Sequence, residues 1–286
     1  MVNSTFETAP APERAESGEL KVSFASISSE KHPERNEDTL LADTEHGTFA
    51  VFDGVGGHAG GETAARLASV VVQESLKGEP TASSVETAIL QANKAVFEKA
   101  QEDPALKGMA ATVSVVRIRQ TPEGEREALI GNVGDSRIYL YRGRELHQLT
   151  LDDNLFLALA QGGPEESLKL QDALNRVSSE EDVRKLGFTD RDHYYRQTSR
   201  ITQALGSERA QIKPRTAAIE LQPGDRLLIT SDGIHDNLTT AEMLGVLSAS
   251  PTAEALMRAA QSRSREEGHI RHKKDDMSAV LVEIPS

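Results

Sequence analysis

The chain has 286 residues, with 32 Lys and Arg against 45 Asp and Glu, so its formal net charge is −13. This acidity disfavours nucleic acid and anionic lipid as partners, no apolar run approaches the roughly 18 residues of a membrane span, and the length allows one large domain or two small ones. The absence of cysteine excludes disulfides and thiolate chemistry and favours the reducing cytoplasm as the compartment.

Residues 1–19 are rich in Ala, Pro, Glu and Ser and contain no apolar signal-peptide core, so we expect a disordered tail. Short apolar or alternating runs then predict strands over 22–27, 39–41, 48–52, 111–118, 128–133 and 137–141. Apolar residues at helical spacing predict one helix around 64–72 and a second one that begins at Ser83. Glu86, three residues after Ser83, predicts a capping box for the second helix.

From about 152 to 197 the sequence is polar and charged with weak helical patterning, which indicates an insertion over one sheet edge and not a separate core. The elements predicted after it are strands over 217–221 and 227–231, a helix capped by Thr239 with Glu242, a helix over 251–267 and a strand over 278–284. Strands and helices do not alternate along the chain. This order predicts an α+β fold of stacked antiparallel sheets with paired helices outside, and argues against a doubly wound parallel sheet.

Three aspartates stand where apolar runs end or begin: Asp53, Asp232 and Asp275. A carboxylate at the mouth of a buried strand is held rigidly and can face a cleft. Two of them are followed by glycine, Gly54 and Gly233, which permits a sharp turn and lets a backbone carbonyl reach a ligand. Because converging carboxylates repel one another unless a cation lies among them, and because oxygen ligands suit hard ions, the pattern predicts Mg²⁺ or Mn²⁺.

The loop after Asp53 places five glycines within residues 54–61 and admits other interpretations. Gly54, Gly56 and Ala59 fit the dinucleotide fingerprint G-x-G-x-x-A, but that motif needs a βαβ unit and a second helix follows here. A Walker loop would need a following Lys-Ser/Thr pair. A plain turn is possible, although so many glycines are entropically costly for connectivity alone.

Seven short motifs, in order, resemble those of the metal-dependent (type 2C, PPM) serine/threonine protein phosphatases of bacterial type. They are Asn36-Glu37-Asp38, Asp53-Gly54-Val55-Gly56-Gly57, Gly134-Asp135-Ser136-Arg137, Leu149-Thr150-Leu151-Asp152, Ala204-Leu205-Gly206, Ser231-Asp232-Gly233 and Asp275-Asp276-Met277-Ser278. The resemblance runs from about Val22 to Ile284. It implies a phosphatase domain over 20–286, built as a four-layer α-β-β-α sandwich of two antiparallel sheets flanked by paired helices, with residues 152–197 as the variable flap.

The resemblance also implies a dinuclear Mn²⁺ or Mg²⁺ site at one edge between the sheets, with a weaker third ion. Asp53 resembles the ligand that bridges both ions, and Asp232 and Asp275 resemble further ligands of the first ion. These three are the expected catalytic residues.

The remaining ligands follow from the same resemblance. The Gly54 carbonyl would serve the second ion, together with Glu37 or Asp38, bound directly or through water. Asp135 matches the position that helps to hold the third ion.

Three positions depart from the family pattern. Where an Arg usually grips the substrate phosphate, this chain has Pro33. Lys31, His32 or Arg35 could serve instead, and among them we favour Arg35 because a guanidinium can bind phosphate in bidentate fashion. The alternative is that Arg35 is a surface residue with no role. Asp276 replaces the usual Asn and adds negative charge. Asp153 stands where His is common, which puts the usual hydrogen bond of that position in doubt.

The resemblance predicts a protein-serine/threonine phosphatase, a phosphoric monoester hydrolase in which a metal-bridging hydroxide attacks phosphorus. The expected partner is a phosphorylated protein, opposite a serine/threonine kinase, with no nucleic acid and no membrane insertion. We expect a cytoplasmic monomer that acts in signalling. The alternatives are a catalytically weak phospho-binding regulatory module on the same fold, and a nucleotide-binding oxidoreductase.

Overall fold

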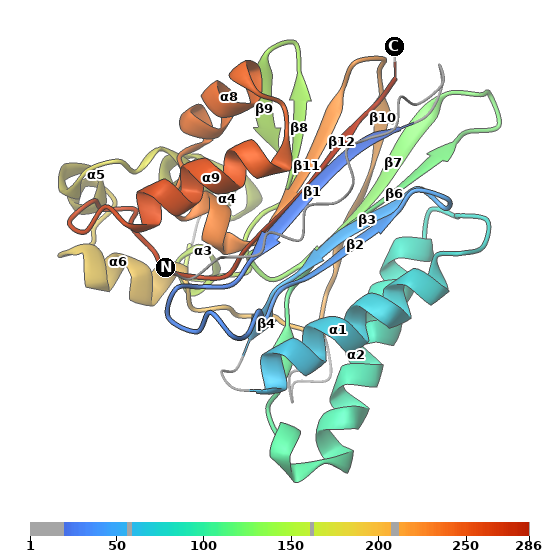
Figure 1. Ribbon diagram of the computed structural model, residues 1–286, viewed down its shortest axis with the longest axis horizontal. Coiled ribbons are helices and arrows are strands. Elements are labelled where there is room, and N and C mark those ends of the chain that lie inside the picture. The colour runs from blue at the N-terminus through green and yellow to red at the C-terminus, as the bar shows by residue number, and fades with distance from the viewer. Residues whose placement is uncertain (1–19, 56–58, 161–162, 207–211, 286) are drawn as a thin grey trace.

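Two five-stranded antiparallel sheets, stacked face to face, form the centre of the molecule (Figure 1). The computed structural model describes residues 20–55, 59–160, 163–206 and 212–285, so the expected tail over 1–19 and loop residues 56–58 lie outside the described residues. The first sheet has the order β1 (Lys21–Ile27), β12 (Met277–Glu283), β11 (Arg226–Thr230), β8 (Arg137–Arg142) and β9 (Glu145–Gln148). The second has the order β10 (Arg215–Leu221), β7 (Arg126–Val133), β6 (Val113–Gln120), β3 (Thr48–Phe52) and β2 (Thr39–Asp43), and a ribbon pairs β4 (Gly54–Val55) with β5 (Ala110–Ala111).

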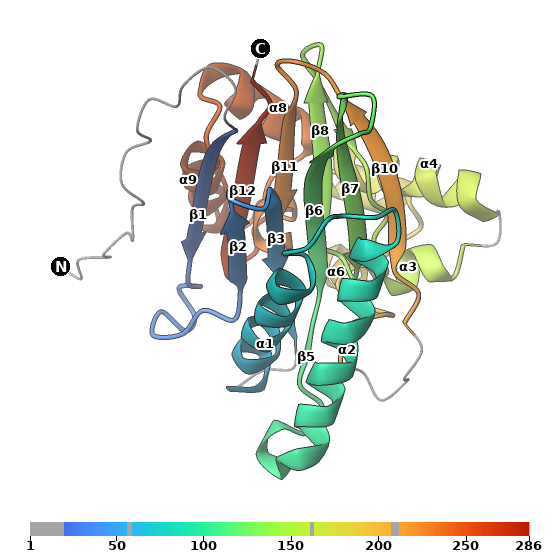
Figure 2. The same cartoon turned by 90° about the vertical axis from the view of Figure 1, so that its right-hand side faces the viewer.

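Helices cover the outer face of each sheet (Figures 1 and 2). The second sheet is covered by α1 (Ala59–Ser75) and α2 (Ser84–Glu102), followed by the short 3₁₀ helix η1 (Pro104–Leu106). The first sheet is covered by α7 (Asp232–His235), α8 (Thr240–Ala249) and α9 (Ala253–Ser264). This arrangement confirms the predicted four-layer α-β-β-α sandwich. Within the described residues, no helix is long and apolar enough to cross a membrane.

Strand β3 shows why the central strands contain continuous apolar runs. Its side chains alternate between two faces, and all five residues are buried. Phe49 and Val51 point into the cluster between the two sheets, whereas Ala50 and Phe52 point into the cluster under α1 and α2. A strand that is buried on both faces therefore lacks the polar alternation of a surface strand, and its first polar neighbour, Asp53, marks the end of the sheet.

Two capping predictions had different outcomes. The box at Thr239 is confirmed, because its hydroxyl accepts from the Glu242 N–H and the Glu242 carboxylate accepts from the Thr239 N–H. The box at Ser83 is wrong. Ser83 has helical backbone angles and no side-chain cap bond, because a preceding turn bonds Thr81 to Ser84 and already starts the chain reversal.

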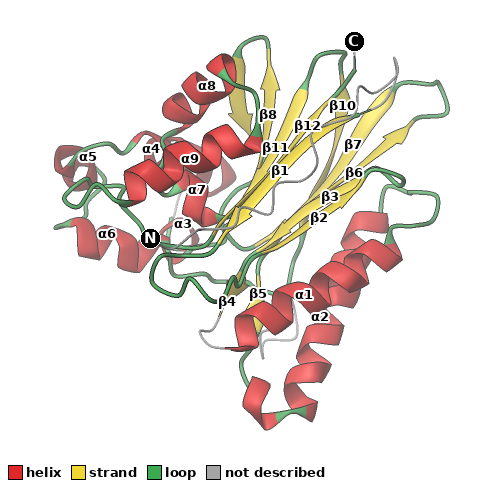
Figure 3. Cartoon of the chain, viewed as in Figure 1, coloured by secondary structure: helices red, strands yellow, loops and turns green. Residues whose placement is uncertain are grey.

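The segment over 152–197 contains more structure than the sequence predicted. It forms four helices, which Figure 3 shows beside α8 and α9: α3 (Leu155–Ala158), α4 (Gly163–Arg176), α5 (Glu180–Lys185) and α6 (Arg191–Thr198). Their apolar side chains, together with Ile270, form a separate hydrophobic cluster around Leu174, Phe188 and Tyr194. The expectation that this segment has no separate core is therefore wrong.

Two buried arginines join this segment to the sandwich. Arg137 of β8 forms a bidentate pair with Asp152, at 2.8 and 2.6 Å. Arg271 donates to the carbonyls of Leu174 and Val177 in the segment and of His235 in α7. Since both guanidinium groups are buried, the start of the segment and the end of α4 are held against the end of the first sheet at which β8 begins.

Candidate metal centre

The three aspartates singled out by the sequence lie at one end of the sandwich, because each is adjacent to a strand end there. Figure 1 shows β4, which follows Asp53, at this end. Asp53 follows β3 of the second sheet, whereas Asp232 begins α7 directly after β11 and Asp275 precedes β12, both in the first sheet. Strands β11 and β12 are antiparallel neighbours, and the Ser231 N–H donates to the Ser278 carbonyl at 3.0 Å, so Asp232 and Asp275 lie at the same sheet edge. The stacking of the two sheets then brings Asp53 within electrostatic range of both.

A row of serines holds Asp38 at this edge. The Ser231 hydroxyl donates to Asp38 Oδ2 at 2.7 Å and accepts from the Ser278 N–H at 3.0 Å. Ser278 also shares a hydrogen bond of 2.8 Å with Ser26, to which Asn36 donates. The Asn36-Glu37-Asp38 segment, which precedes β2, is thereby fixed to strands of the other sheet.

The backbone around Asp53 approaches its neighbours too closely for side chains. The Asp53 N–H donates to the Thr112 hydroxyl at 3.2 Å, and the Gly54 N–H donates to the Glu37 carbonyl at 3.1 Å. A Cβ on Gly54 would lie 2.4 Å from the backbone of Gly61 and 2.7 Å from the Glu37 carbonyl. Gly54 is therefore required by the close contact of three backbone segments, and not by a positive φ.

Asp276, the residue that departs from the family pattern, organises the loop that carries Glu37. Its two carboxylate oxygens accept from the Ser29 N–H at 2.6 Å and from the Glu37 N–H at 2.7 Å. His32 lies 3.6 Å from the same carboxylate. Both oxygens are thus used as acceptors for backbone amides, a task that an Asn side chain performs with only one oxygen.

Asp135 lies in the turn between β7 and β8. Gly134 adopts a φ of +98° there, and its N–H donates to Asp153 Oδ2 at 3.1 Å. Asp153 also pairs with Arg215 at 2.6 Å. The substitution of the common His by Asp153 therefore preserves an anchor for the turn, and Asp135 itself is 4% exposed.

The electrostatics of the cluster are those of crowded, desolvated carboxylates. Burial raises the pKa of Asp38, Asp53 and Asp135 well above the usual range, and neighbouring acids raise it further. Burial also raises the pKa of Asp232, to about 7, against the opposing effect of Lys273. Such a set is unfavourable as free anions, so it favours binding of protons or cations.

The contacts of Lys273 were not anticipated from the sequence. Its ammonium group contacts Asp232, lies 2.8 Å from Asp236 and 3.2 Å from Asp275, and 16% of its side chain is exposed. Burial lowers the pKa of Lys273, but the three carboxylates outweigh this effect and raise it above the ordinary value. The sequence offers one indication of these contacts, a lysine two residues before the predicted ligand Asp275. On its own, such a lysine indicates a solvent-exposed charge.

The donor set suits a hard divalent cation. Within the described residues, Asp38 Oδ1 and Asp135 Oδ1 are buried without a hydrogen-bond partner, and carboxylate oxygens are the ligands that Mg²⁺ and Mn²⁺ prefer. In the same part of the chain, no three His, Asp or Glu side chains already surround a common point as ion ligands. The unpartnered carboxylate oxygens of Asp38 and Asp135 are therefore available to a hard cation.

Arg35, the candidate phosphate clamp, lies at the rim of this cluster. Its guanidinium pairs with Glu37 at 2.9 Å, and 28% of its side chain is exposed. The partner of Arg35 in this structure is thus another predicted site residue, Glu37.

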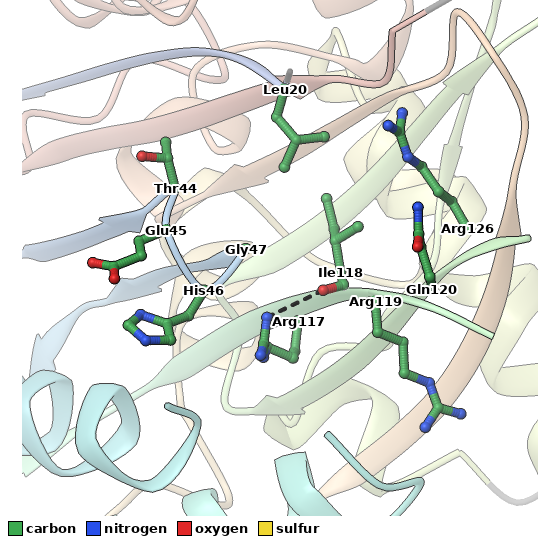
Figure 4. A pocket seen from close by; sticks show the side chains of 10 residues that line it. All are labelled: Leu20, Thr44, Glu45, His46, Gly47, Arg117, Ile118, Arg119, Gln120 and Arg126. Carbon is green, nitrogen blue, oxygen red and sulfur yellow. Dashed lines mark hydrogen bonds between the residues drawn. The ribbon is translucent and has the colours of Figure 1, made fainter. Parts of the chain in front are cut away.

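A surface pocket of about 240 Å³ lies elsewhere (Figure 4). It is lined by the β2–β3 turn, including His46, and by Arg117 and Arg119 of β6. The turn precedes β3, whereas Asp53 follows it, so the pocket and the acids are at opposite ends of a strand that spans about 17 Å. The pocket is not part of the candidate metal centre.

Known proteins similar to this chain are phosphatases. The family model for protein phosphatase 2C matches residues 28–281. The serine/threonine protein phosphatase PstP of Mycobacterium tuberculosis is 28% identical over 252 residues, which are 87% of this chain and 42% of PstP. Serine/threonine phosphatase stp of Listeria innocua is 27% identical over 263 residues, which are 88% of this chain and 90% of that protein. The chain therefore spans less than half the length of PstP but almost all of the Listeria protein.

Solved structures show the same fold. The crystal structure of the M. tuberculosis phosphatase PstP/Ppp has a TM-score of 0.71 and 26% identity, with 94% of this chain and 100% of that chain covered. A structure of the PstP catalytic domain in complex with two manganese ions has a TM-score of 0.67 and 23% identity, with 94% and 99% covered.

Proposed function

Since the chain belongs to the protein phosphatase 2C family, we propose that it is a metal-dependent phosphatase that hydrolyses phosphoserine and phosphothreonine in proteins. The observation that carries the proposal is the meeting of acids from both sheets at one end of the sandwich, with pKa values raised by burial and mutual repulsion. Every carboxylate that the resemblance assigns to a metal centre is present in the sequence. A degenerate phospho-binding module would be expected to have lost some of them, so the catalytic function is favoured.

The proposed ligands are those that the family resemblance assigns. Asp53, which follows β3 of the second sheet, would be a ligand of both ions, and Asp232 and Asp275, at the edge of the first sheet, would be further ligands of the first ion. The second ion would take the Gly54 carbonyl and Glu37 or Asp38. Asp135 would contribute to a weaker third site.

The chemistry that two divalent cations supply, when bound, is a water of lowered pKa and a stabilised charge on the phosphoryl oxygens. The protein contributes the geometry. The serine row positions Asp38, Thr112 positions the backbone of Asp53, and Asp276 positions the backbone of Glu37. Arg35 would orient the substrate phosphate by a bidentate contact once its guanidinium group has left Glu37.

Other attributes belong to the same proposal. The oxygen donors support Mn²⁺ or Mg²⁺ and do not distinguish between them. A phosphoprotein substrate implies an opposing serine/threonine kinase, and hence a role in signalling. The absence of cysteine supports a reducing, cytoplasmic location, and we propose that the chain acts as a monomer.

The function is tested with the purified chain and a phosphothreonine peptide. We expect phosphate release with added Mn²⁺, loss of release in EDTA, and a decrease of at least about a hundredfold in Asp232→Asn, because loss of even indirect metal partners typically costs 10–100-fold. Asp172→Asn, which alters an exposed acid on α4, is the matched control and keeps its activity. Undiminished turnover in EDTA would reject the metal-dependent function.

A further inference from the structure

Lys273 is placed among the acids by a rigid backbone contact. Its N–H donates to Asn237 Oδ1 at 3.0 Å, and its carbonyl accepts from Asn237 Nδ2 at 2.8 Å. Asn237 is fully buried and also donates to the Gly233 carbonyl at 2.8 Å. The backbone of Lys273 is therefore tied to α7, the element that begins with Asp232, so the position of the ammonium group is part of the fold.

The ammonium group touches two acids of the proposed first metal site and one acid outside the proposed site. Its contacts with Asp232 and Asp275 join the two carboxylates that the first ion would need. The third contact, 2.8 Å to Asp236, involves a residue that is not among the proposed ligands. The same carboxylate oxygens cannot serve an ammonium group and a divalent cation at about 2.0–2.1 Å together, because the cations would repel each other at that range.

We propose that Lys273 is an internal counter-cation, which holds Asp232 and Asp275 together in the metal-free protein and gives them up when the first divalent ion binds. The inference rests on the proposed function, since it concerns the same metal centre. After release, the ammonium group can stay paired with Asp236, because Asp236 is not among the proposed metal ligands. The exchange has two consequences: the acidic cluster is stable enough to fold without metal, and the first ion binds more weakly than the bare carboxylates would allow.

The test measures Mn²⁺ affinity directly, by isothermal titration calorimetry on protein stripped with EDTA. The variant Lys273→Met removes the charge and keeps a long apolar stem. We expect its apparent Kd for the tighter Mn²⁺ site to fall by at least about tenfold, which corresponds to about 1.4 kcal/mol. The melting temperature of the metal-free variant is expected to fall as well, since the carboxylates lose their counter-cation.

The adjacent lysine gives a matched control. Lys274 has 30% of its side chain exposed and lies 3.7 Å from Glu267, away from the acids of the centre. Lys274→Met is expected to bind Mn²⁺ within about twofold of the wild type, because exposed pairs of this kind contribute little. Lys273→Arg, which keeps the charge, is expected to retain the weaker wild-type affinity. If Lys273→Met does not fold, the neutral Lys273→Gln replaces it with the same expected tightening.

The outcomes separate this inference from the proposed function. If the wild type binds Mn²⁺ and the neutral variants bind it equally or more weakly, the internal counter-cation is rejected and the metal centre stands. If neither the wild type nor the variants bind Mn²⁺, both the centre and the inference are rejected. Tightening in the neutral variants, with Lys274→Met unchanged, supports the exchange.

Discussion

Replacement of Asp276 by Asn tests how this chain orders the loop that carries Glu37. The carboxylate accepts two backbone N–H groups, from Ser29 at 2.6 Å and from Glu37 at 2.7 Å. An amide keeps one acceptor oxygen and turns an NH₂ group toward the other backbone donor. A hydrogen bond to a charged group contributes about 1.5–3 kcal/mol, and a buried donor left without a partner costs about 1–3 kcal/mol.

Part of that loss is offset, because burial raises the pKa of Asp276 and the charged form is already disfavoured, with Asp275 adding repulsion. We therefore expect a net destabilisation of about 1–3 kcal/mol in EDTA, which lowers the melting temperature by about 2–4 °C per kcal/mol in a domain of this size. Urea unfolding followed by circular dichroism measures the free energy. Hydrogen exchange should show faster exchange of the Ser29 and Glu37 amides. Asp172→Asn, an exposed acid, is the control and should remain within about 0.5 kcal/mol of the wild type. An Asp276→Asn protein as stable as the wild type, with unchanged amide protection, would refute the reasoning.

Two further predictions concern the same end of the molecule. The folded-state pKa of Asp232 is raised to about 7, so between about pH 4 and 7 the folded metal-free protein holds a proton that the unfolded chain releases. The free energy of unfolding should therefore fall as the pH rises through this range, by up to about 1.4 kcal/mol per pH unit for this group. Thermal unfolding in EDTA at several pH values measures this fall. Saturating Mn²⁺ should abolish the fall, because metal ligands bind in the deprotonated form. A free energy of unfolding that rises with pH in EDTA would contradict the assignment. Gly233→Ala should destabilise the protein by about 3 kcal/mol or more, because its Cβ would lie 1.9 Å from the Asp276 carbonyl. Gly245→Ala in α8, where nothing lies within 4 Å of the new Cβ, should be neutral or stabilising by about 0.5–1 kcal/mol, and equal stability of the two variants would rule out the steric argument.

The layers of the fold were predictable because each central strand is short, apolar and ended by a polar residue. Thr48–Phe52 is the clearest case, since burial on both faces leaves no polar position between Phe49 and Phe52. The acids at these ends were predictable for the same reason. The helices over 152–197 were not, because their apolar side chains, such as Phe188 and Tyr194, are sparse and pack in a small cluster apart from the main core.

The contacts within the centre were beyond sequence reasoning because they join distant residues. Ser231 reaches Asp38 across 193 positions, and Asp276 reaches Ser29 across 247. No local pattern encodes such pairs. Lys273 illustrates the consequence: its sequence neighbours suggest a solvated basic loop, whereas its spatial neighbours are three carboxylates.

The central claim is that acids from both sheets converge on a pair of divalent cations. Anomalous diffraction at the manganese absorption edge, from crystals grown with saturating Mn²⁺, tests it most directly. The account predicts two strong peaks at the β4 end of the sandwich, with the Asp53 carboxylate contacting both and Asp232 contacting one. Manganese peaks confined to other parts of the surface, with none between Asp53 and Asp232, would contradict it.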